Sequence, residues 1–221
     1  MYVERRVARI AGSTGAVTSA RTLDVAERLV QVRGFAGFTY AQIADEMGIS
    51  KASLHYHFAG KADLGLALIN RYRTRFRSTV EQISAAGAPA AESLAEFVLI
   101  HESVLRDGRM CLCGMLAADY DVLPEPMRVA VVDFFDENER WLAGVLESGR
   151  DRGELAFSGS AQEAAQTIIG GLEGAMLTTR PYGEIHRFEV MASRLIRGTV
   201  GADIDGTRAA RAGARSESGP G

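Results

Sequence analysis

The sequence predicts an all-α protein, with an N-terminal three-helix helix-turn-helix domain and a C-terminal helical bundle of about nine helices in total. Two observations carry this prediction. Between residues 18 and 200, apolar residues recur at spacings of three and four in nearly every segment, and no stretch alternates as a strand does. Gly and Pro residues stand where these periodic segments end.

The first helix is expected to end near Gly34, and residues 40–47 and 51–57 should form two short helices. A long helix begins at Lys61. Its predicted buried stripe consists of Leu64, Leu68, Tyr72, Phe76, Val80 and Ile83. Further helices are predicted to begin at Pro89 and to cover residues 111–120, 124–152, 160–180 and 185–199.

Four regions follow from this pattern. Residues 1–17 and 201–221 are rich in Gly, Ala, Ser and Arg without periodicity, and are expected to be flexible tails. Residues 18–65 should form the helix-turn-helix domain. Residues 66–200 should form a second domain with its own core.

Charge is divided unevenly along the chain. Residues 1–77 carry 12 basic and 6 acidic side chains, whereas residues 78–200 carry 10 basic and 19 acidic ones. A basic N-terminal part (the head, residues 1–77) followed by an acidic remainder (the body, residues 78–200) suggests that only the head binds a polyanion such as DNA. Chance scatter of charges is the alternative at this point.

Cysteine content and apolar runs indicate where in the cell the protein is expected. Cys111 and Cys113 are too few and too close for a disulfide framework, and no apolar run reaches the ~20 residues that cross a bilayer. The first 20 residues lack the core of a signal peptide. A cytoplasmic protein without a membrane partner is therefore expected, and no cofactor or metal site is predicted.

The strongest local signal lies between Phe38 and Phe58. Thr39 and Gln42 have the spacing of a capping box, so a helix should begin there. Gly48 can take the left-handed conformation that ends a helix, and Ser50 can cap the next one. A helix, a tight turn and a second helix form the helix-turn-helix pattern. The plainer alternative is an ordinary helix pair joined by a glycine turn.

The second helix of this motif would enter the major groove with its N-terminal turn against base edges. Lys51, Ser53 and His55 are then candidates for hydrogen bonds to bases, and Ala52 for contact with a thymine methyl group. The expected phosphate contacts are Thr39, Tyr40, Tyr56, His57 and Lys61.

These residues resemble a known family. The stretch from Thr39 to Leu64, with Gly48-Ile49-Ser50 and Leu54-His55-Tyr56-His57-Phe58, is similar to the DNA-binding signature of the TetR/AcrR regulators. The family usually has Tyr where His55 stands, and the aromatic residue here is at the next position. The resemblance implies DNA binding by the first three helices, an inducer inside the body, and pairing of two subunits through the last two long helices.

The segment 160–180 carries glycines that suit close helix packing. Gly inside a helix costs up to about 1 kcal/mol relative to Ala, so several of them suggest a packing reason. A two-fold homodimer interface is predicted, with packing inside one chain as the alternative. Its expected residues are Gly170, Gly171, Gly174, Met176, Phe188, Met191 and Leu195.

Polar residues among apolar stripes indicate a ligand cavity in the body. His101, Asn138 and Glu173 are the candidate polar groups, although a histidine on an apolar face is more often a hydrogen-bonded core residue. Aromatic residues at helical spacing are likewise core in most proteins. The candidate apolar wall consists of Phe97, Met115, Phe134 and Trp141.

Cys111 lies at the predicted start of a helix, where the helix dipole lowers the pKa of a thiol. A thiolate facing the cavity would react with electrophiles, and burial as an inert core residue is the alternative. The sequence thus predicts a DNA-binding regulator, most simply a repressor that leaves a palindromic operator when a small-molecule effector, including a thiol-reactive electrophile, occupies the body. A helical-bundle enzyme lacks the motifs that it needs, and a protein-binding adaptor leaves the basic head unexplained.

Overall fold

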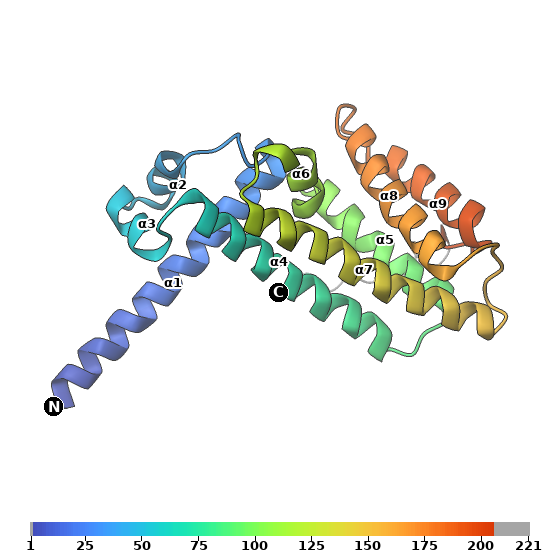
Figure 1. The fold of residues 1–221 in the computed structure, drawn as a ribbon, viewed down its shortest axis with the longest axis horizontal. Helices are drawn as coiled ribbons and strands as arrows, with labels where there is room; N and C mark the ends of the chain where they lie inside the picture. The colour runs from blue at the N-terminus through green and yellow to red at the C-terminus, as the bar shows by residue number, and fades with distance from the viewer. Residues whose placement is uncertain (1, 206–221) are drawn as a thin grey trace, which may run out of the picture. The chain divides into compact units, whose positions relative to one another are not determined.

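The computed structural model describes residues 2–205, with side chains from residue 17 onward, and over this range the chain forms nine α-helices and one 3₁₀ helix without strands (Figure 1). The predicted fold class is therefore confirmed. The helices are α1 (Tyr2–Arg33), α2 (Tyr40–Met47), α3 (Lys51–His57), α4 (Lys61–Ala85), α5 (Ala90–Arg106), α6 (Leu112–Ala118), η1 (Tyr120–Val122), α7 (Glu125–Asp151), α8 (Ala161–Thr179) and α9 (Ile185–Val200).

The sequence predicts flexible tails at both ends of the chain, and the structure differs at each end. Helix α1 begins at Tyr2, so its backbone includes residues 2–17. A formed helix adds further residues at little cost when no Pro interrupts them, even where the sequence has no apolar period. At the other end, Ala202 and Ile204 are buried, and the hydroxyl of Ser193 donates to the carboxylate of Asp205. The rest of the predicted C-terminal tail, residues 206–221, lies outside the described part.

The helices divide into two compact units. The first unit contains residues 1–72 and 112–131, and the second contains residues 73–111 and those from 132 onward. The predicted boundary at residue 65 ignored α6, which packs against α1 in the first unit. Such a contact joins segments far apart in sequence, so no local pattern reveals it. Helices α4 and α7 each continue from one unit into the other.

The core of the first unit is built from α1, the short helices α2 and α3, and the start of α4. Burial of apolar surface is the main favourable term in its folding. Helix α2 contributes Ile43 and Ala44, and α3 contributes Leu54. The other fully or nearly fully buried apolar side chains include Ala26, Leu29, Val30, Phe38, Leu64 and Leu68.

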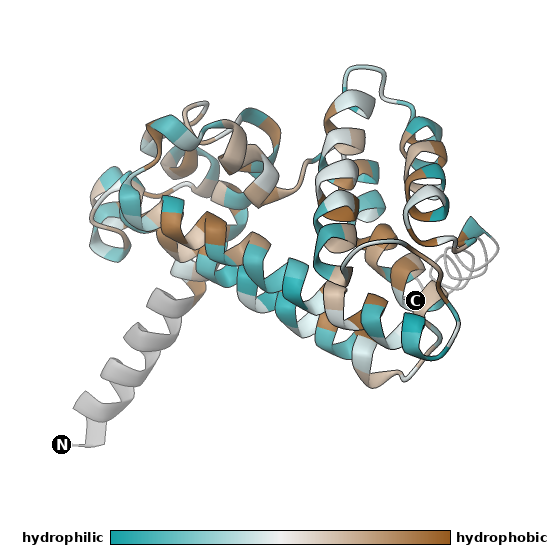
Figure 2. Ribbon diagram, turned by 45° about the vertical axis from the view of Figure 1, so that its right-hand side comes forward, coloured by the Kyte–Doolittle hydropathy of each residue, from teal (hydrophilic) through white to brown (hydrophobic). Residues whose placement is uncertain are grey.

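In the second unit, α8 and α9 form the closest helix pair. Gly171 allows this approach, because a Cβ atom there would lie 2.5 Å from a methyl group of Leu195. Met176 of α8 and Phe188 of α9 are both fully buried. Figure 2 shows hydrophobic and hydrophilic residues along each of these helices, as expected where one face is buried and another meets solvent.

Candidate DNA-binding and ligand-binding sites

The helix-turn-helix is held by hydrogen bonds that span only a few residues. The hydroxyl of Thr39 accepts from the backbone N–H of Gln42, whose side-chain oxygen accepts in return from the backbone N–H of Thr39. Gly48 ends α2 with a φ of 66°, in the left-handed region that favours glycine. The hydroxyl of Ser50 then accepts from the backbone N–H of Ser53 at 3.1 Å. The predicted caps and turn are all present.

Helix α3 turns one side inward and leaves the other open. Leu54 is fully buried, whereas the predicted DNA contacts Lys51, Ala52 and His55 are exposed. Tyr56 has 86% of its surface exposed, which is the largest value among the exposed large apolar residues of the described chain. Ser53 and His57 are half-buried, and Thr39 is exposed.

Tyr40 has a structural role that the sequence did not reveal. Its hydroxyl lies 2.5 Å from the carbonyl oxygen of Gly60 and 3.2 Å from that of Phe58, so it ties α2 to the turn before α4. Burial, with the nearby carboxylate of Asp63, raises the pKa of Tyr40 to about 12. Its ring packs against His55, with 4.8 Å between the ring centres. The predicted phosphate contact of Tyr40 stays a prediction.

Lys61 also makes contacts inside the first unit. Its Nζ donates to the carbonyl oxygen of Phe38 at 2.7 Å and lies over the rings of Phe38 and Phe35. Burial lowers the pKa of Lys61, and the carboxylate of Asp119 opposes this effect. An ammonium group has three N–H donors, and the bond to Phe38 uses one of them. Lys61 thus supports the residue before the Thr39 cap, and its predicted phosphate contact remains a prediction.

Ion pairs connect helix α1 to α2 and α4 in the first unit. Arg28 of α1 pairs with Glu46 of α2. Arg71 of α4 binds two acidic residues of α1, Asp24 at 2.7 Å and Glu27 at 2.9 Å. The carboxylate of Glu27 is 7% exposed, and a buried charge requires such a partner. No local sequence pattern reveals these pairs, because the paired residues lie on different helices.

A cavity of about 340 Å³ lies between α4 and α7 in the second unit, within the size range of small-molecule pockets. Three predicted pocket residues line it together: Phe134, Asn138 and Trp141. The Nδ2 group of Asn138 donates to the carbonyl oxygen of Phe134 at 2.8 Å. The cavity also has charged residues on its wall that the sequence did not indicate: Arg73, Arg77, Glu81, Glu137 and Arg140.

The other predicted pocket residues do not line this cavity. Phe97 and His101 are buried in a cluster of aromatic rings with Phe76, and the Nδ1 atom of His101 lies 3.0 Å from the carbonyl oxygen of Phe97. His101 is therefore a hydrogen-bonded core residue, the alternative that the sequence left open. Cys111 is 3% exposed and Cys113 is fully buried. Met115 belongs to the first unit, and Glu173 is half-buried on α8.

The predicted dimer residues also separate into two groups. Met176 and Phe188 are fully buried inside the single chain, and Gly171 of α8 packs against Leu195 of α9. Gly170 and Gly174 are exposed, with nothing within 4 Å of a Cβ atom placed there. Met191 and Leu195 are half-buried.

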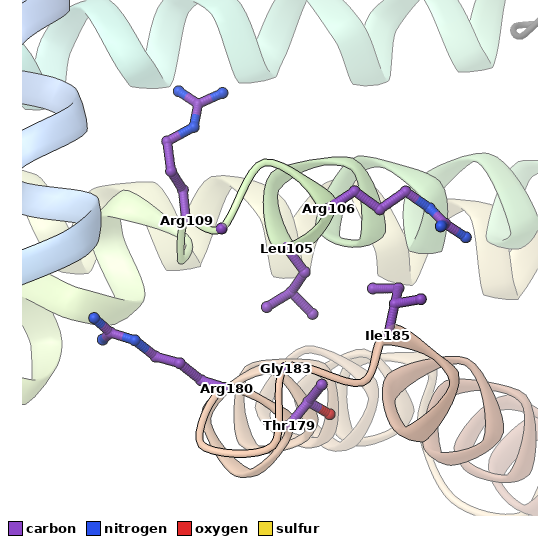
Figure 3. A pocket seen from close by; sticks show the side chains of 8 residues that line it. Leu105, Arg106, Arg109, Thr179, Arg180, Gly183 and Ile185 are labelled. Atoms are coloured by element: carbon purple, nitrogen blue, oxygen red, sulfur yellow. The ribbon is translucent and has the colours of Figure 1, made fainter.

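A second cavity, of about 360 Å³, lies where the end of α5 meets the turn between α8 and α9 (Figure 3). No sequence pattern predicts this cavity, because its walls come from segments about 75 residues apart that meet only in the fold. The residues that line it are Leu105, Arg106, Gly108, Arg109, Thr179, Arg180, Gly183 and Ile185.

Comparison with known proteins identifies the family. Residues 23–68 match the family model for bacterial regulatory proteins of the tetR family, and residues 92–195 match that for the tetracyclin repressor-like C-terminal domain. A TetR transcriptional regulator from Legionella pneumophila has a solved structure that is 31% identical, with a TM-score of 0.72, over 81% of this chain and 95% of that one. The chain belongs to the TetR family.

Other relatives agree with this assignment. A TetR-family regulator from Agrobacterium tumefaciens is 28% identical, with a TM-score of 0.81, over 84% of this chain and 98% of that one. The transcriptional regulator AcuR of Cereibacter sphaeroides is 29% identical over 152 residues, which cover 67% of this chain and 69% of AcuR. These relatives confirm a DNA-binding transcriptional regulator rather than an enzyme. Within the described residues of this TetR-family chain, no helix is long and apolar enough to span a membrane.

Proposed function

We propose that this TetR-family protein acts in the cytoplasm as a homodimeric repressor, which leaves a palindromic operator when a small molecule occupies the α4–α7 cavity. The observation that carries the DNA-binding role is the open face of α3, where Lys51, His55 and Tyr56 are exposed beside a buried Leu54. Two copies of this helix, about 34–36 Å apart, would fit successive major grooves.

Operator binding tests the first part of the proposal. Fragments selected from genomic DNA by the purified protein would supply the operator, and fluorescence anisotropy would measure affinity at several salt concentrations. Lys51→Met should lower the slope of log affinity against log salt concentration by about 2, because each of the two subunits loses one contact of a cation with a phosphate. Arg187→Met, on the exposed start of α9, is the matched control. Equal slopes for both variants would contradict a role for α3.

The proposed dimer is supported by the exposed side of α8 and α9. Gly170 and Gly174 leave room for another helix, and the apolar side chains of Leu177 in α8 and Val190 in α9 are 57% and 39% exposed. Small residues four apart allow close helix approach. Gly174→Leu should give a monomer in analytical ultracentrifugation, because its side chain would fill the space needed by the second copy. Gly144→Leu on α7 is the control, since Gly144 is equally open, and a dimer in both variants would contradict this interface.

The effector site is supported by the cavity and by the residues that line it. Trp141 is the only tryptophan of the chain and lines the cavity, with its Nε1 donating to the hydroxyl of Ser84 at 2.8 Å. Its fluorescence therefore reports directly on this site. Compounds from a metabolite collection that change the fluorescence should also lower operator affinity, and Arg77→Met should alter both responses together. Operator release without any fluorescence change would place the effector elsewhere.

The electrophile hypothesis stays a prediction. Both Cys111 and Cys113 are buried, so a reagent reaches either thiol only after local opening of the structure. N-ethylmaleimide treatment followed by operator binding tests it, with Cys111→Ser and Cys113→Ser as controls. Unchanged operator affinity after complete alkylation would remove this hypothesis and leave the proposed repressor intact.

A further inference from the structure

The cavity at the α8–α9 turn is lined by cations and by no carboxylate. Arg106, Arg109 and Arg180 are among its eight lining residues, which include neither Asp nor Glu. Figure 3 shows that their side chains start near the space between Leu105 and Thr179 and extend away from it in different directions. Carboxylates outside the lining pair with two of these arginines, since Arg106 binds Glu102 and Glu189 and Arg109 binds Asp107. The rim formed by these arginines therefore offers guanidinium donors to an anion rather than a large excess of positive charge.

Existing ion pairs leave donors available at this rim. Arg106 binds Glu102 through Nε and Nη2 and binds Glu189 through Nη2, so its Nη1 donates to neither carboxylate. A guanidinium group has five N–H donors and holds a carboxylate through two of them at once. The rim can accordingly bind an additional carboxylate while the contacts of Arg106 to α5 and α9 persist.

The wall behind the rim is apolar. Leu105 of α5 points toward the turn that carries Thr179 and Ile185 (Figure 3). Inorganic phosphate or sulfate would leave this apolar surface uncovered, and a volume of about 360 Å³ is large for such an ion. Ligand pockets of this size combine apolar walls with a few polar groups that fix orientation. An anion with an apolar body fits both features.

Thr179 supplies a polar group that no protein atom satisfies. Its side chain is 3% exposed, and its Oγ1 atom has no hydrogen-bond partner. The neighbouring Thr178 shows the usual solution, since its hydroxyl donates to the carbonyl oxygen of Gly174 at 2.8 Å. A buried hydroxyl without a partner is unfavourable. Rotation about the Cα–Cβ bond moves the hydroxyl of Thr179 to another staggered position, so the hydroxyl can turn toward a ligand in the cavity.

We propose that this cavity binds a small organic carboxylate. Its apolar body lies against Leu105 and Ile185, and its carboxylate accepts hydrogen bonds from Thr179 and from an arginine of the rim. This cavity shares no lining residue with the α4–α7 cavity. The site is therefore separate from the proposed effector site, and binding of a carboxylate there can be tested independently of operator binding.

Isothermal titration calorimetry of the full-length protein without DNA tests this proposal with three probes. Benzoate combines a carboxylate with a flat apolar body, benzamide keeps the shape without the charge, and inorganic phosphate keeps the charge without the body. Benzoate should bind saturably and at least about tenfold more tightly than either other probe, because charge-assisted hydrogen bonds and apolar burial both contribute. Equal binding of benzamide, stronger binding of phosphate, or no saturable benzoate binding would overturn the proposal.

Variants locate the site. Thr179→Val keeps the size of the side chain and Arg180→Met keeps most of its length, and each should weaken benzoate binding about tenfold or more. Thr178→Val in α8 and Arg187→Met in α9 change residues near the turn that do not line the cavity, and both variants should bind benzoate as the wild type does. Circular dichroism verifies that each variant is folded, and Thr179→Val should not lower the melting temperature, since its hydroxyl has no partner to lose. Loss of binding in Arg77→Met alone would assign benzoate to the α4–α7 cavity and overturn the proposal.

Discussion

The carboxylate of Asp119 accepts a hydrogen bond from the backbone N–H of Phe35, with 2.6 Å between the two heavy atoms. Asp119 directly follows α6, whereas Phe35 lies in the loop between α1 and α2. Gly34 permits this contact, because a Cβ atom there would stand 2.6 Å from the same carboxylate oxygen. The end of α6 is thereby attached to the segment that leads into the helix-turn-helix.

Removing this attachment should destabilise the first unit. We expect Asp119→Ala to lower the free energy of unfolding by about 1–2 kcal/mol. Hydrogen bonds to charged groups contribute up to about 3 kcal/mol, and this one contributes less because it is partly exposed to solvent. Urea denaturation followed by circular dichroism measures this change. Asp121→Ala, an exposed carboxylate two residues further on, should change stability by less than about 0.5 kcal/mol. Equal losses in both variants would show that the contact with Phe35 contributes nothing.

Lys61 and Lys51 should respond differently to the same substitution. Lys61→Met removes the hydrogen bond to Phe38 and the contacts with two aromatic rings, so it should lower stability by about 1–2 kcal/mol and also weaken operator binding. Lys51→Met changes an exposed side chain and should weaken operator binding without loss of stability. Thermal denaturation and fluorescence anisotropy separate the two effects. Normal stability of Lys61→Met would show that its inward contacts are not supporting α2.

Tyr40 predicts a loss of stability at high pH. Its pKa of about 12 in the folded protein lies above the ordinary value of 10.0, so the folded state retains the phenolic proton more strongly. The stabilisation is present in full below pH 10 and is lost as the pH rises toward 12. Tyr40→Phe cannot ionise, and its stability should fall less over this interval than that of the wild type. If urea denaturation shows that the free energies of unfolding of the two proteins change equally between pH 10 and pH 12, this role of Tyr40 is contradicted.

Glu154 predicts the opposite dependence at low pH. Hydrogen bonds from the side chain of Arg152 and from the backbone N–H of Ala90 hold the pKa of Glu154 at about 2, below its ordinary value of 4.5. The stabilisation is present above pH 4.5 and is lost as the pH falls toward 2. The free energy of unfolding of Glu154→Gln should therefore fall less than that of the wild type as the pH is lowered from 4.5 toward 2, as measured by urea denaturation. Glu125→Gln, an exposed carboxylate on α7, controls for the loss of one negative charge, and an identical effect there would contradict the assignment.

Most of the helix-turn-helix could be predicted because its signals are local. The capping pair Thr39 and Gln42, the turn at Gly48 and the cap at Ser50 all act across no more than three residues. Such patterns restrict the backbone wherever they occur, so the predicted helices at residues 40–47 and 51–57 agree with α2 and α3. Apolar periodicity predicted the long helices for the same reason.

Local patterns could not show which of several similar residues would face a given partner. The three glycines of α8 look alike in sequence, yet Gly171 contacts Leu195 while Gly170 and Gly174 are open. Lys61 has the position of a phosphate contact, yet its ammonium group binds Phe38 within the first unit. Each outcome depends on how a helix is rotated against its neighbours, which packing of the whole core decides.

By itself, then, the amino-acid order determined that this chain would be helical and about where the helices from α2 to α9 would begin and end, and it predicted α3 as the helix that contacts DNA. Tertiary structure alone decided the contact between Asp119 and Phe35 and the position of both cavities. The physical reason is distance along the chain: caps and turns join near neighbours, whereas these features join residues from about 55 to 85 positions apart, whose meeting depends on burial of apolar surface across the whole fold.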